Sequence, residues 1–530
     1  MRGIQRTRSH HNVGRLVSRL LSMFLVGWLA LSAPLLPVQA EDPLPADPAE
    51  ISWFTFSGGA FRDTATDVVL AADGSGTVFM VGDSAAEWGT PVSAFSGSTA
   101  GFAAAYASDG SLLWHTCLSA AGAAAECMAT SAAYVPTGHL AVIGWCSTTW
   151  GTPVRPFSGG KDVFVAQLNL NGSLEWLTFL GSLADDNAGG VTADDNGAIY
   201  VTGFSEAVWG SAAETISSSS AAFVAKLNGA GLLQWNTFLG GEAVSSGSAI
   251  GRDEWGNLYV AGLSEDSWGS PLRAYSADDD VFAVKLSPTG SLQWLTFVGG
   301  LGKEMLTGAV SDAAGNFYLA GGSQASWGSP VEAYAGTGDI FAARLAPQGE
   351  LVWNTFLGSA EADDYAFDIA IDLSGNLYLA GFSFLPWGNP WHAWEGPLPV
   401  VMPDAFAARL SPDGDLDWNM FAGSSLPNLL ATGVAVDGRG SVYVSGYGAD
   451  DWPGALNPLA GNDDAFLMKI GVPLAAVRCG GQLIPSGLTQ GSLTLGTDFG
   501  WQPVGSAMRR TFTLTNEGEM TLSFANDPAV

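Results

Sequence analysis

The sequence is poor in basic residues and in histidine. It contains 20 Lys and Arg residues against 51 Asp and Glu residues in a chain of 530. A surface this acidic repels nucleic acid phosphates, so we expect no nucleic acid partner. Only His115, His139 and His392 lie beyond residue 40, too few and too scattered for a zinc site. Because no G-x-S-x-G elbow or P-loop occurs either, the sequence offers no catalytic residue and leans against an enzyme without deciding the question.

Long hydrophobic runs are absent after residue 40. Before it, an apolar run from Leu20 to Leu36 leads to the small-residue site Val38-Gln39-Ala40. Five arginines and no acid stand in these first 40 residues: Arg2, Arg6, Arg8, Arg15 and Arg19. This pattern predicts a signal peptide over residues 1–40 and a secreted or cell-surface protein, with an uncleaved N-terminal anchor as the alternative. Cleavage would leave 15 of the 20 basic residues against 51 acidic ones, a net charge of −36.

Tryptophan, in contrast, recurs with a period. Motifs close to W-x-T-F-x-G repeat about every 60 residues, at Trp53, Trp114, Trp176, Trp235, Trp294, Trp353 and Trp418. A second series opens loops of the W-G-[ST]-P type, at Trp88, Trp150, Trp209, Trp268, Trp327, Trp387 and Trp452. Segments related to Y-[VL]-[AT]-G and F-[VA]-A-[KR]-L keep the same step. The chain is therefore built from about seven copies of one unit.

One unit shows the expected strands. Asp368–Asp372 alternates apolar and polar residues, Ser374-Gly375-Asn376 makes a turn, and Leu377–Gly381 continues as a second strand. Ala405–Leu410 and Leu416–Phe421 supply the third and fourth strands. Four short strands cannot bury both faces alone, so the units must stack on one another. Radial stacking predicts an all-β fold, a seven-bladed β-propeller of four-stranded blades, and a linear solenoid is the alternative.

The ends of the repeat array complete each other. The array begins with an unaccompanied fourth strand, Ile51–Ser57, and ends after a third strand, Ala465–Ile470. Joining them completes the seventh blade with the N-terminal strand. This closure removes the exposed sheet edges.

The units resemble the bacterial SBBP repeat, a seven-bladed β-propeller repeat family. The resemblance rests on W-N-T-F-L-G at Trp235 and Trp353 and on G-N-L-Y-[VL]-A-G at Gly256 and Gly375. It covers about residues 51–472 and implies the fold but no single activity.

After Pro473 the period is lost. The segment from Gly496 to Gly518 resembles the start of a choice-of-anchor D domain, an immunoglobulin-like sandwich of the ASPM/SPD-2/Hydin type. Such a sandwich needs about 100 residues, so a partial domain is expected over 473–530. The predicted organisation is a signal peptide (1–40), a linker (41–50), the propeller (51–472) and this partial domain.

The four cysteines allow a disulfide in an exported chain. Cys127 falls where the first strand of its blade begins and Cys146 where the second ends, and antiparallel pairing brings those ends together. We predict a Cys127–Cys146 bridge, with Cys117 as the rival partner and Cys479 in another domain. Buried free thiols are the alternative.

Binding residues are expected on the face that carries the longer loops, at positions where the units differ from one another. The candidates are Asp185, Asp186, Asp278, Asp279, Glu361, Asp363, Asp364, Trp391 and Trp394. The Trp residues of the W-G-[ST]-P loops could form a sugar or peptide platform, but a residue found in every unit is expected to serve blade packing. The acidic loops could hold Ca²⁺, although none has EF-hand spacing, so we predict no cofactor and leave the metal unknown.

These features together predict a monomeric, exported propeller that binds a glycan or a protein without catalysis. A glycosidase or lyase that uses two central carboxylates is one alternative. A structural spacer in a longer adhesin is the other.

Overall fold

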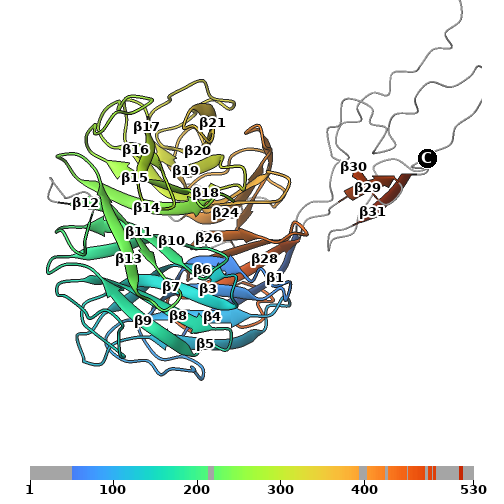
Figure 1. The fold of residues 1–530 in the computed structure, drawn as a ribbon. Helices are drawn as coiled ribbons and strands as arrows, with labels where there is room; N and C mark the ends of the chain where they lie inside the picture. The colour runs from blue at the N-terminus through green and yellow to red at the C-terminus, as the bar shows by residue number, and fades with distance from the viewer. Residues whose placement is uncertain are drawn as a thin grey trace, which may run out of the picture. The chain divides into compact units, whose positions relative to one another are not determined.

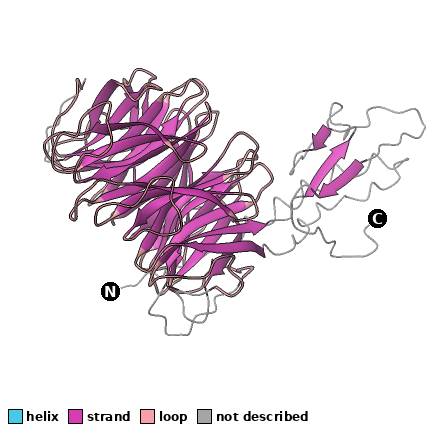
Figure 2. Ribbon diagram, turned by 90° about the horizontal axis from the view of Figure 1, so that it is seen from below, coloured by secondary structure: helices cyan, strands magenta, loops and turns pink. Residues whose placement is uncertain are grey.

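The computed structural model describes residues 50–212, 220–392, 403–423, 428–449, 452–471, 475–479, 482–484 and 512–516 (Figure 1). Every regular element in these ranges is a β-strand (Figure 2). None of the ranges contains a helix with the length and hydrophobicity needed to cross a membrane. The predicted signal peptide and nearly all of the linker lie outside the described residues.

Seven antiparallel four-stranded sheets form the blades of the propeller, as predicted. Blade 1 consists of β2 (Asp63–Leu70), β3 (Val78–Ser84), β4 (Ala100–Tyr106) and β5 (Leu112–Leu118). Blade 2 consists of β6 (Cys127–Val135), β7 (His139–Cys146), β8 (Asp162–Asn169) and β9 (Leu174–Leu180). Blade 3 consists of β10 (Asp186–Ala193), β11 (Ile199–Ser205), β12 (Ala221–Leu227) and β13 (Leu233–Leu239).

The remaining blades have the same order of strands. Blade 4 consists of β14 (Ser245–Arg252), β15 (Leu258–Ser264), β16 (Asp280–Leu286) and β17 (Leu292–Val298). Blade 5 consists of β18 (Glu304–Ser311), β19 (Phe317–Ser323), β20 (Asp339–Leu345) and β21 (Leu351–Leu357). Blade 6 consists of β22 (Asp364–Ile371), β23 (Leu377–Ser383), β24 (Asp404–Leu410) and β25 (Leu416–Ala422).

Blade 7 closes the ring. It combines β26 (Leu429–Val436), β27 (Val442–Gly448) and β28 (Asp464–Gly471) with the N-terminal strand β1 (Glu50–Ser57). Strand β1 pairs antiparallel with β28, with Phe56 opposite Phe466. The predicted closure is therefore confirmed.

The first strand of each blade is the innermost one. Neighbouring first strands contact each other in turn around the ring, from β2 through β6, β10, β14, β18, β22 and β26 back to β2. Each of them is interrupted by a register shift near its centre. In blade 6 the shift falls between Ala366 and Asp368, so Phe367 has no residue opposite it. This bulge interrupts the polar–apolar alternation, which is why the sequence pattern detects only Asp368–Asp372 of a strand that begins at Asp364.

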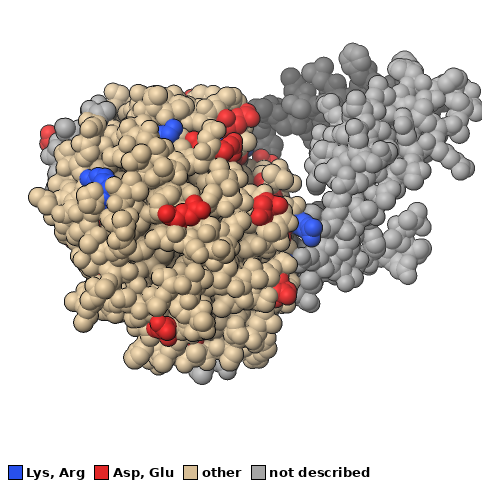
Figure 3. All heavy atoms as spheres, turned by 60° about the horizontal axis from the view of Figure 1, so that its bottom comes forward, with Lys and Arg blue, Asp and Glu red and all other residues tan. Residues whose placement is uncertain are grey.

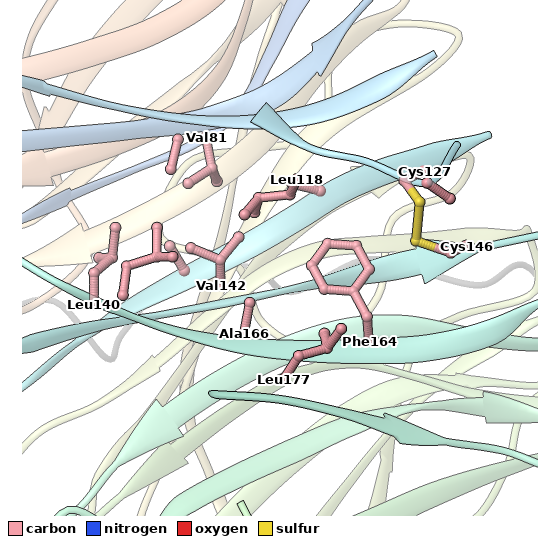
Figure 4. Packing of buried hydrophobic residues seen from close by; sticks show 14 of the residues in the cluster. Val81, Leu118, Cys127, Leu140, Val142, Cys146, Phe164, Ala166 and Leu177 are labelled. Carbon is pink, nitrogen blue, oxygen red and sulfur yellow. A yellow bond between two sulfur atoms is a disulfide. The ribbon is translucent and has the colours of Figure 1, made fainter. Parts of the chain in front are cut away.

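The core is divided among the spaces between blades. Between blades 1 and 2, side chains of both sheets interdigitate, among them Val81, Leu118, Val142, Phe164 and Leu177 (Figure 4). All five are at most 1% exposed. Full burial of such a side chain stabilises the fold by about 1.5–3 kcal/mol, so the stacking of blades supplies the cohesion that a single blade lacks.

The predicted disulfide between Cys127 and Cys146 is present, with the two residues directly opposite each other on β6 and β7. Cys117 is a buried free thiol, and burial raises its pKa to about 12. The equivalent register in four other blades pairs an acid with a serine: Asp63 with Ser84, Asp186 with Ser205, Glu304 with Ser323, and Asp364 with Ser383. Each serine hydroxyl donates to its acid. The disulfide thus replaces a buried hydrogen bond of the repeat.

The tryptophans of the fourth strands join adjacent blades. The indole Nε1–H of Trp114 donates to the carbonyl of Leu170 in the next blade (2.8 Å), and Trp353 donates to that of Pro412 (3.1 Å). Trp53, Trp176 and Trp294 make the same inter-blade bond. The accepting turns end in positive-φ glycines; a Cβ on Gly172, for example, would lie 2.6 Å from the Trp114 ring. The repeated tryptophan therefore needs its glycine partner one blade further on.

Replacing Trp353 with Phe should keep the ring packing and remove the bond to Pro412. We expect a loss of about 1 kcal/mol in the free energy of unfolding, because the partly buried carbonyl of Pro412 loses its donor. Urea denaturation of the full chain measures it. The control is Trp255→Phe, since Trp255 is 62% exposed. Equal losses in both variants would show that the inter-blade bond contributes nothing specific.

Three further strands lie beyond the propeller. They are β29 (Ala475–Cys479), β30 (Gln482–Ile484) and β31 (Phe512–Asn516), and they form an antiparallel sheet in the order β30-β29-β31. Most of the predicted sandwich over 473–530 lies outside the described residues.

Candidate functional site

The propeller has one face with long loops and one with tight turns. The connections from second to third strand and from fourth to first strand emerge together, and we call this side the long-loop face. On the other side, turns such as Asp372–Asn376 are closed by their own side chains, with Asp372 accepting from the backbone N–H groups of Ser374 and Asn376. The space-filling view in Figure 3 shows one side of the molecule, where scattered carboxylates outnumber basic groups on a largely uncharged surface.

The Trp residues of the W-G-[ST]-P loops lie in the packing between strands. Trp88, Trp209, Trp327 and Trp387 are 5–8% exposed. Six of the seven pack edge-on against the phenylalanine of their own third strand, in the pairs Trp88–Phe102, Trp150–Phe164, Trp209–Phe223, Trp268–Phe282, Trp327–Phe341 and Trp387–Phe406. Trp452 instead stacks on Phe54 of the closing strand. Their position fits the expected packing role rather than an exposed platform.

The acidic candidates divide into buried and exposed residues. Asp186 and Asp364 are fully buried acceptors of serine hydroxyls and backbone N–H groups. Asp185 accepts from the Lys161 N–H (3.0 Å), Asp279 pairs with Lys303 Nζ (2.7 Å), and Asp363 accepts from Thr337 Oγ1 (2.7 Å).

Asp278 and Glu361 are exposed, and Asp278 has a positive φ of 50°. Trp391 stacks on Trp418 with ring centroids 4.9 Å apart. Trp394 lies outside the described residues. Within the part of the chain that the structure describes, no three His, Cys, Asp or Glu side chains converge as a metal site.

An aromatic cluster in blade 6 was missed by the sequence reasoning. Tyr365 and Phe367 on β22 pack against Phe382 on β23, with ring centroids 5.6 and 5.5 Å apart, and Phe384 packs on Phe382 at 5.6 Å. All four side chains are partly exposed. Tyr365, Phe382 and Phe384 lie at the ends of β22 and β23 that adjoin the long-loop face, next to the loop that carries Glu361, and Phe367 lies at the bulge of β22. We call these four residues the blade-6 aromatic cluster.

A signal for this cluster exists in the repeat itself. The bulge residue of the first strand is small in the other six blades, namely Thr66, Thr130, Gly189, Ser248, Thr307 and Thr432. In three of them the threonine hydroxyl donates to a backbone carbonyl of the next blade. Phe367 cannot make that bond. An alignment of the seven units would have shown Phe367 as the one large residue at a position that is otherwise small. Blade packing does not require a large residue there.

Two aspartates of the innermost strands influence each other electrostatically. Asp67 on β2 and Asp368 on β22 occupy equivalent positions just after the bulge. Burial raises the pKa of both carboxyl groups, and the charge of Asp67 raises that of Asp368 further. Their oxygens accept backbone N–H groups of the following blade, Ala132 for Asp67 and Val434 for Asp368, both at 2.9 Å. These carboxylates therefore connect neighbouring innermost strands.

Comparison with known proteins identifies no family for this chain. No family model matches the chain, and no curated protein matches it significantly. Among solved structures, the chain is similar to the polysaccharide lyase Uly1, with 9% identity, a TM-score of 0.42, and coverage of 81% of this chain and 99% of that one.

It is also similar to the WD40 domain of Neurospora crassa Pan2 (9% identity, TM-score 0.40, covering 80% and 96%). A third similar structure is that of YCF48 bound to D1 peptide, with 12% identity, a TM-score of 0.37, and coverage of 83% of this chain and 99% of that one. At these identities and scores the likenesses carry no argument about activity.

Proposed function

We propose that this chain is an exported or cell-surface propeller that binds a glycan or a protein on its long-loop face. The observation that carries the proposal is the blade-6 aromatic cluster, which is partly exposed, adjoins that face and departs from the repeat. Aromatic side chains provide large, rigid contact areas for sugars and peptide side chains alike. Exposed Glu361 and half-exposed Asp363 beside the cluster supply polar groups that could orient a ligand.

Several features support export. The first 40 residues have the composition of a signal peptide. The Cys127–Cys146 bridge is fully buried, and structural disulfides of this kind belong to oxidising compartments. The resemblance to SBBP repeats and to a choice-of-anchor D domain over 473–530 fits the same location, and we include both in the proposal.

The non-catalytic form is favoured by the contacts of the central carboxylates. A glycosidase or lyase needs two carboxyl groups free to reach the substrate. Asp67 and Asp368 instead accept hydrogen bonds from the backbone of the next blade. We include a monomeric state in the proposal, and binding experiments test it against the spacer role.

The proposal predicts that Phe367→Thr strongly weakens ligand binding. Threonine is the residue found at this position in four other blades, so the variant should fold, and it removes one wall of the aromatic cluster. The purified full chain is applied to a broad glycan array and to an extracellular protein array, with calcium and then with chelator. We expect a saturable hit that weakens at least about tenfold in the variant, as loss of an aromatic contact requires.

The matched control is Leu373→Ser, which removes a 98% exposed apolar side chain from the tight turn on the opposite side of blade 6. It should bind like the wild type. If Phe367→Thr binds the ligand as well as the wild type does, the binding site lies elsewhere than the aromatic cluster. No hit on either array would favour the spacer role instead.

A further inference from the structure

Pairs of acidic side chains meet at four of the junctions between blades. At each junction an acid that opens a third strand lies beside the acid that opens the next first strand, over a glycine. The four sets are Asp464 and Asp63 over Gly58, Asp162 and Asp186 over Gly181, Asp280 and Glu304 over Gly299, and Asp339 and Asp364 over Gly358. All eight acids are 0–2% exposed. The junctions therefore concentrate carboxyl groups where no water reaches them.

The junction of blades 4 and 5 shows the arrangement most fully. Asp280 Oδ2 accepts the Ser276 N–H (2.5 Å). Glu304 Oε1 accepts the Ser323 hydroxyl (3.0 Å) and the Gly300 N–H (3.2 Å). The other two oxygens, Asp280 Oδ1 and Glu304 Oε2, are buried and receive no donor from the rest of the protein.

These two oxygens point at the same place. They lie 2.4 and 2.5 Å from the position that a Cβ on Gly299 would take. Two buried acceptors this close repel each other unless something with positive charge lies between them. Asp162 Oδ1 is likewise without a donor, 2.6 Å from the Cβ position of Gly181, where Asp186 Oδ2 lies at 2.7 Å.

A proton fits this space better than a metal ion does. Ca²⁺ takes six to eight oxygen ligands, whereas the junction offers two free ones. The carbonyl of Gly299 is already engaged by Arg273 Nη2 (2.6 Å) and Ser276 Oγ (3.3 Å). One proton converts the two facing acceptors into a hydrogen-bonded carboxyl–carboxylate pair and needs no further ligand.

We propose that the carboxyl pairs at the junctions of blades 2 and 3 and of blades 4 and 5, where buried oxygens lack a donor, are proton-binding sites, each holding one shared proton, and that they make the propeller more stable in acid than in alkaline solution. The pairs tie the end of one blade to the start of the next. When the shared proton leaves, two buried negative charges face each other at the junction, and the contact between blades weakens.

The charged groups around the Asp280–Glu304 pair are consistent with this. Arg273 is the cation beside Asp280, and Lys303 is neutralised by Asp279. Further negative charge and a phenol come from Asp266, Asp278 and Tyr275. Burial, followed by the charge of Asp280, raises the pKa of Glu304 to about 8. Burial likewise raises the pKa of one acid in each of the other pairs to about 6, namely Asp63, Asp162 and Asp364.

The sign follows from proton linkage. A carboxyl group whose pKa is higher in the folded than in the unfolded chain binds more protons when folded. Its contribution is complete below the unfolded pKa of about 4 and is lost as the pH rises through the folded value. The window is therefore about pH 4 to 6 for Asp162–Asp186 and extends to about pH 8 for Asp280–Glu304.

The test is Glu304→Gln in the full chain. The amide can donate to Asp280 Oδ1 at every pH, so the variant mimics the protonated acid. Urea unfolding between about pH 5 and about pH 9 should show that the folding equilibrium constant of the wild type decreases as the pH rises. In the variant this decrease should be at least about tenfold smaller. Glu254→Gln, at an exposed glutamate in a tight turn, should keep the wild-type slope.

Infrared spectroscopy gives a readout that does not depend on stability. The wild type should show a protonated carboxylic acid band at neutral pH that disappears on titration to about pH 9, and Glu304→Gln should reduce it. Absence of the band at neutral pH would overturn the proposal. The proposal would also be overturned if the free energy of unfolding did not change with pH but changed with calcium or chelator. That result would indicate a cation at the junction.

Discussion

Substitution of Gly321 by Ala should destabilise the propeller by at least about 3 kcal/mol, because a Cβ has no room there. Gly321 lies on the second strand of blade 5, in a position that recurs in every blade at the end of the Y-[VL]-[AT]-G segment. A Cβ on it would lie 1.8 Å from the carbonyl oxygen of Met305 on the innermost strand. Urea denaturation of the full chain measures the loss, and failure to fold would be its extreme form.

The same clash is present in all seven blades, with distances of 1.8–2.0 Å to a first-strand carbonyl. The glycines are Gly82, Gly144, Gly203, Gly262, Gly321, Gly381 and Gly446. None of them has a positive φ, so the close approach of the bulged first strand is the reason, not the backbone conformation. The control is Gly438→Ala, because nothing lies within 4 Å of a Cβ there. If Gly321→Ala is as harmless as this control, the first strand can move away, and the bulge is not a fixed feature.

Removal of the disulfide by Cys127→Ala with Cys146→Ala should cost about 3 kcal/mol of unfolding free energy. The pair closes a loop with a sequence separation of 19 and lies fully buried between blades 1 and 2. We expect the alternative pair Cys127→Asp with Cys146→Ser to recover part of that loss. Other blades hold an acid–serine hydrogen bond in this register, and the third strand of the preceding blade opens with Ala100, so the new acid meets no second carboxyl group there.

Denaturation with and without a reductant tests both variants. Reduction should lower the wild type to the level of the double alanine variant and leave the two variants unchanged. Should the wild type keep its stability under reductant, the bridge would not be a stabilising element. If aspartate and serine recover nothing, the disulfide occupies a space that the acid–serine pair cannot fill.

Much of the architecture was predictable because it is periodic. The spacing of Trp53, Trp114 and their successors gave the number of blades, and the alternation within each unit gave four strands. The pairing of Cys127 with Cys146 followed from the ends of two adjacent strands. In each case the contact is local in the sequence or repeats with it, so a one-dimensional pattern contains the information.

The candidate site was predicted less well for a physical reason. Acidity in a loop does not distinguish an exposed ligand from a buried hydrogen-bond acceptor. Asp185 and Asp363 keep partial exposure, while their neighbours Asp186 and Asp364 point inward and bind serine hydroxyls. Adjacent residues of a strand face opposite sides, and the register that decides which side is set by pairing.

The sequence by itself determined the class of fold, the number of blades, the closure of the ring by its first strand and the disulfide. The tertiary structure alone decided which residues meet across blades. It brings Phe367 onto Phe382 and Asp280 against Glu304. These contacts depend on the bulge in each innermost strand and on the stacking of one sheet against the next. The bulge and the stacking do leave repeated glycines and tryptophans in the sequence, but the repeat does not say which side chains of separate units meet in space.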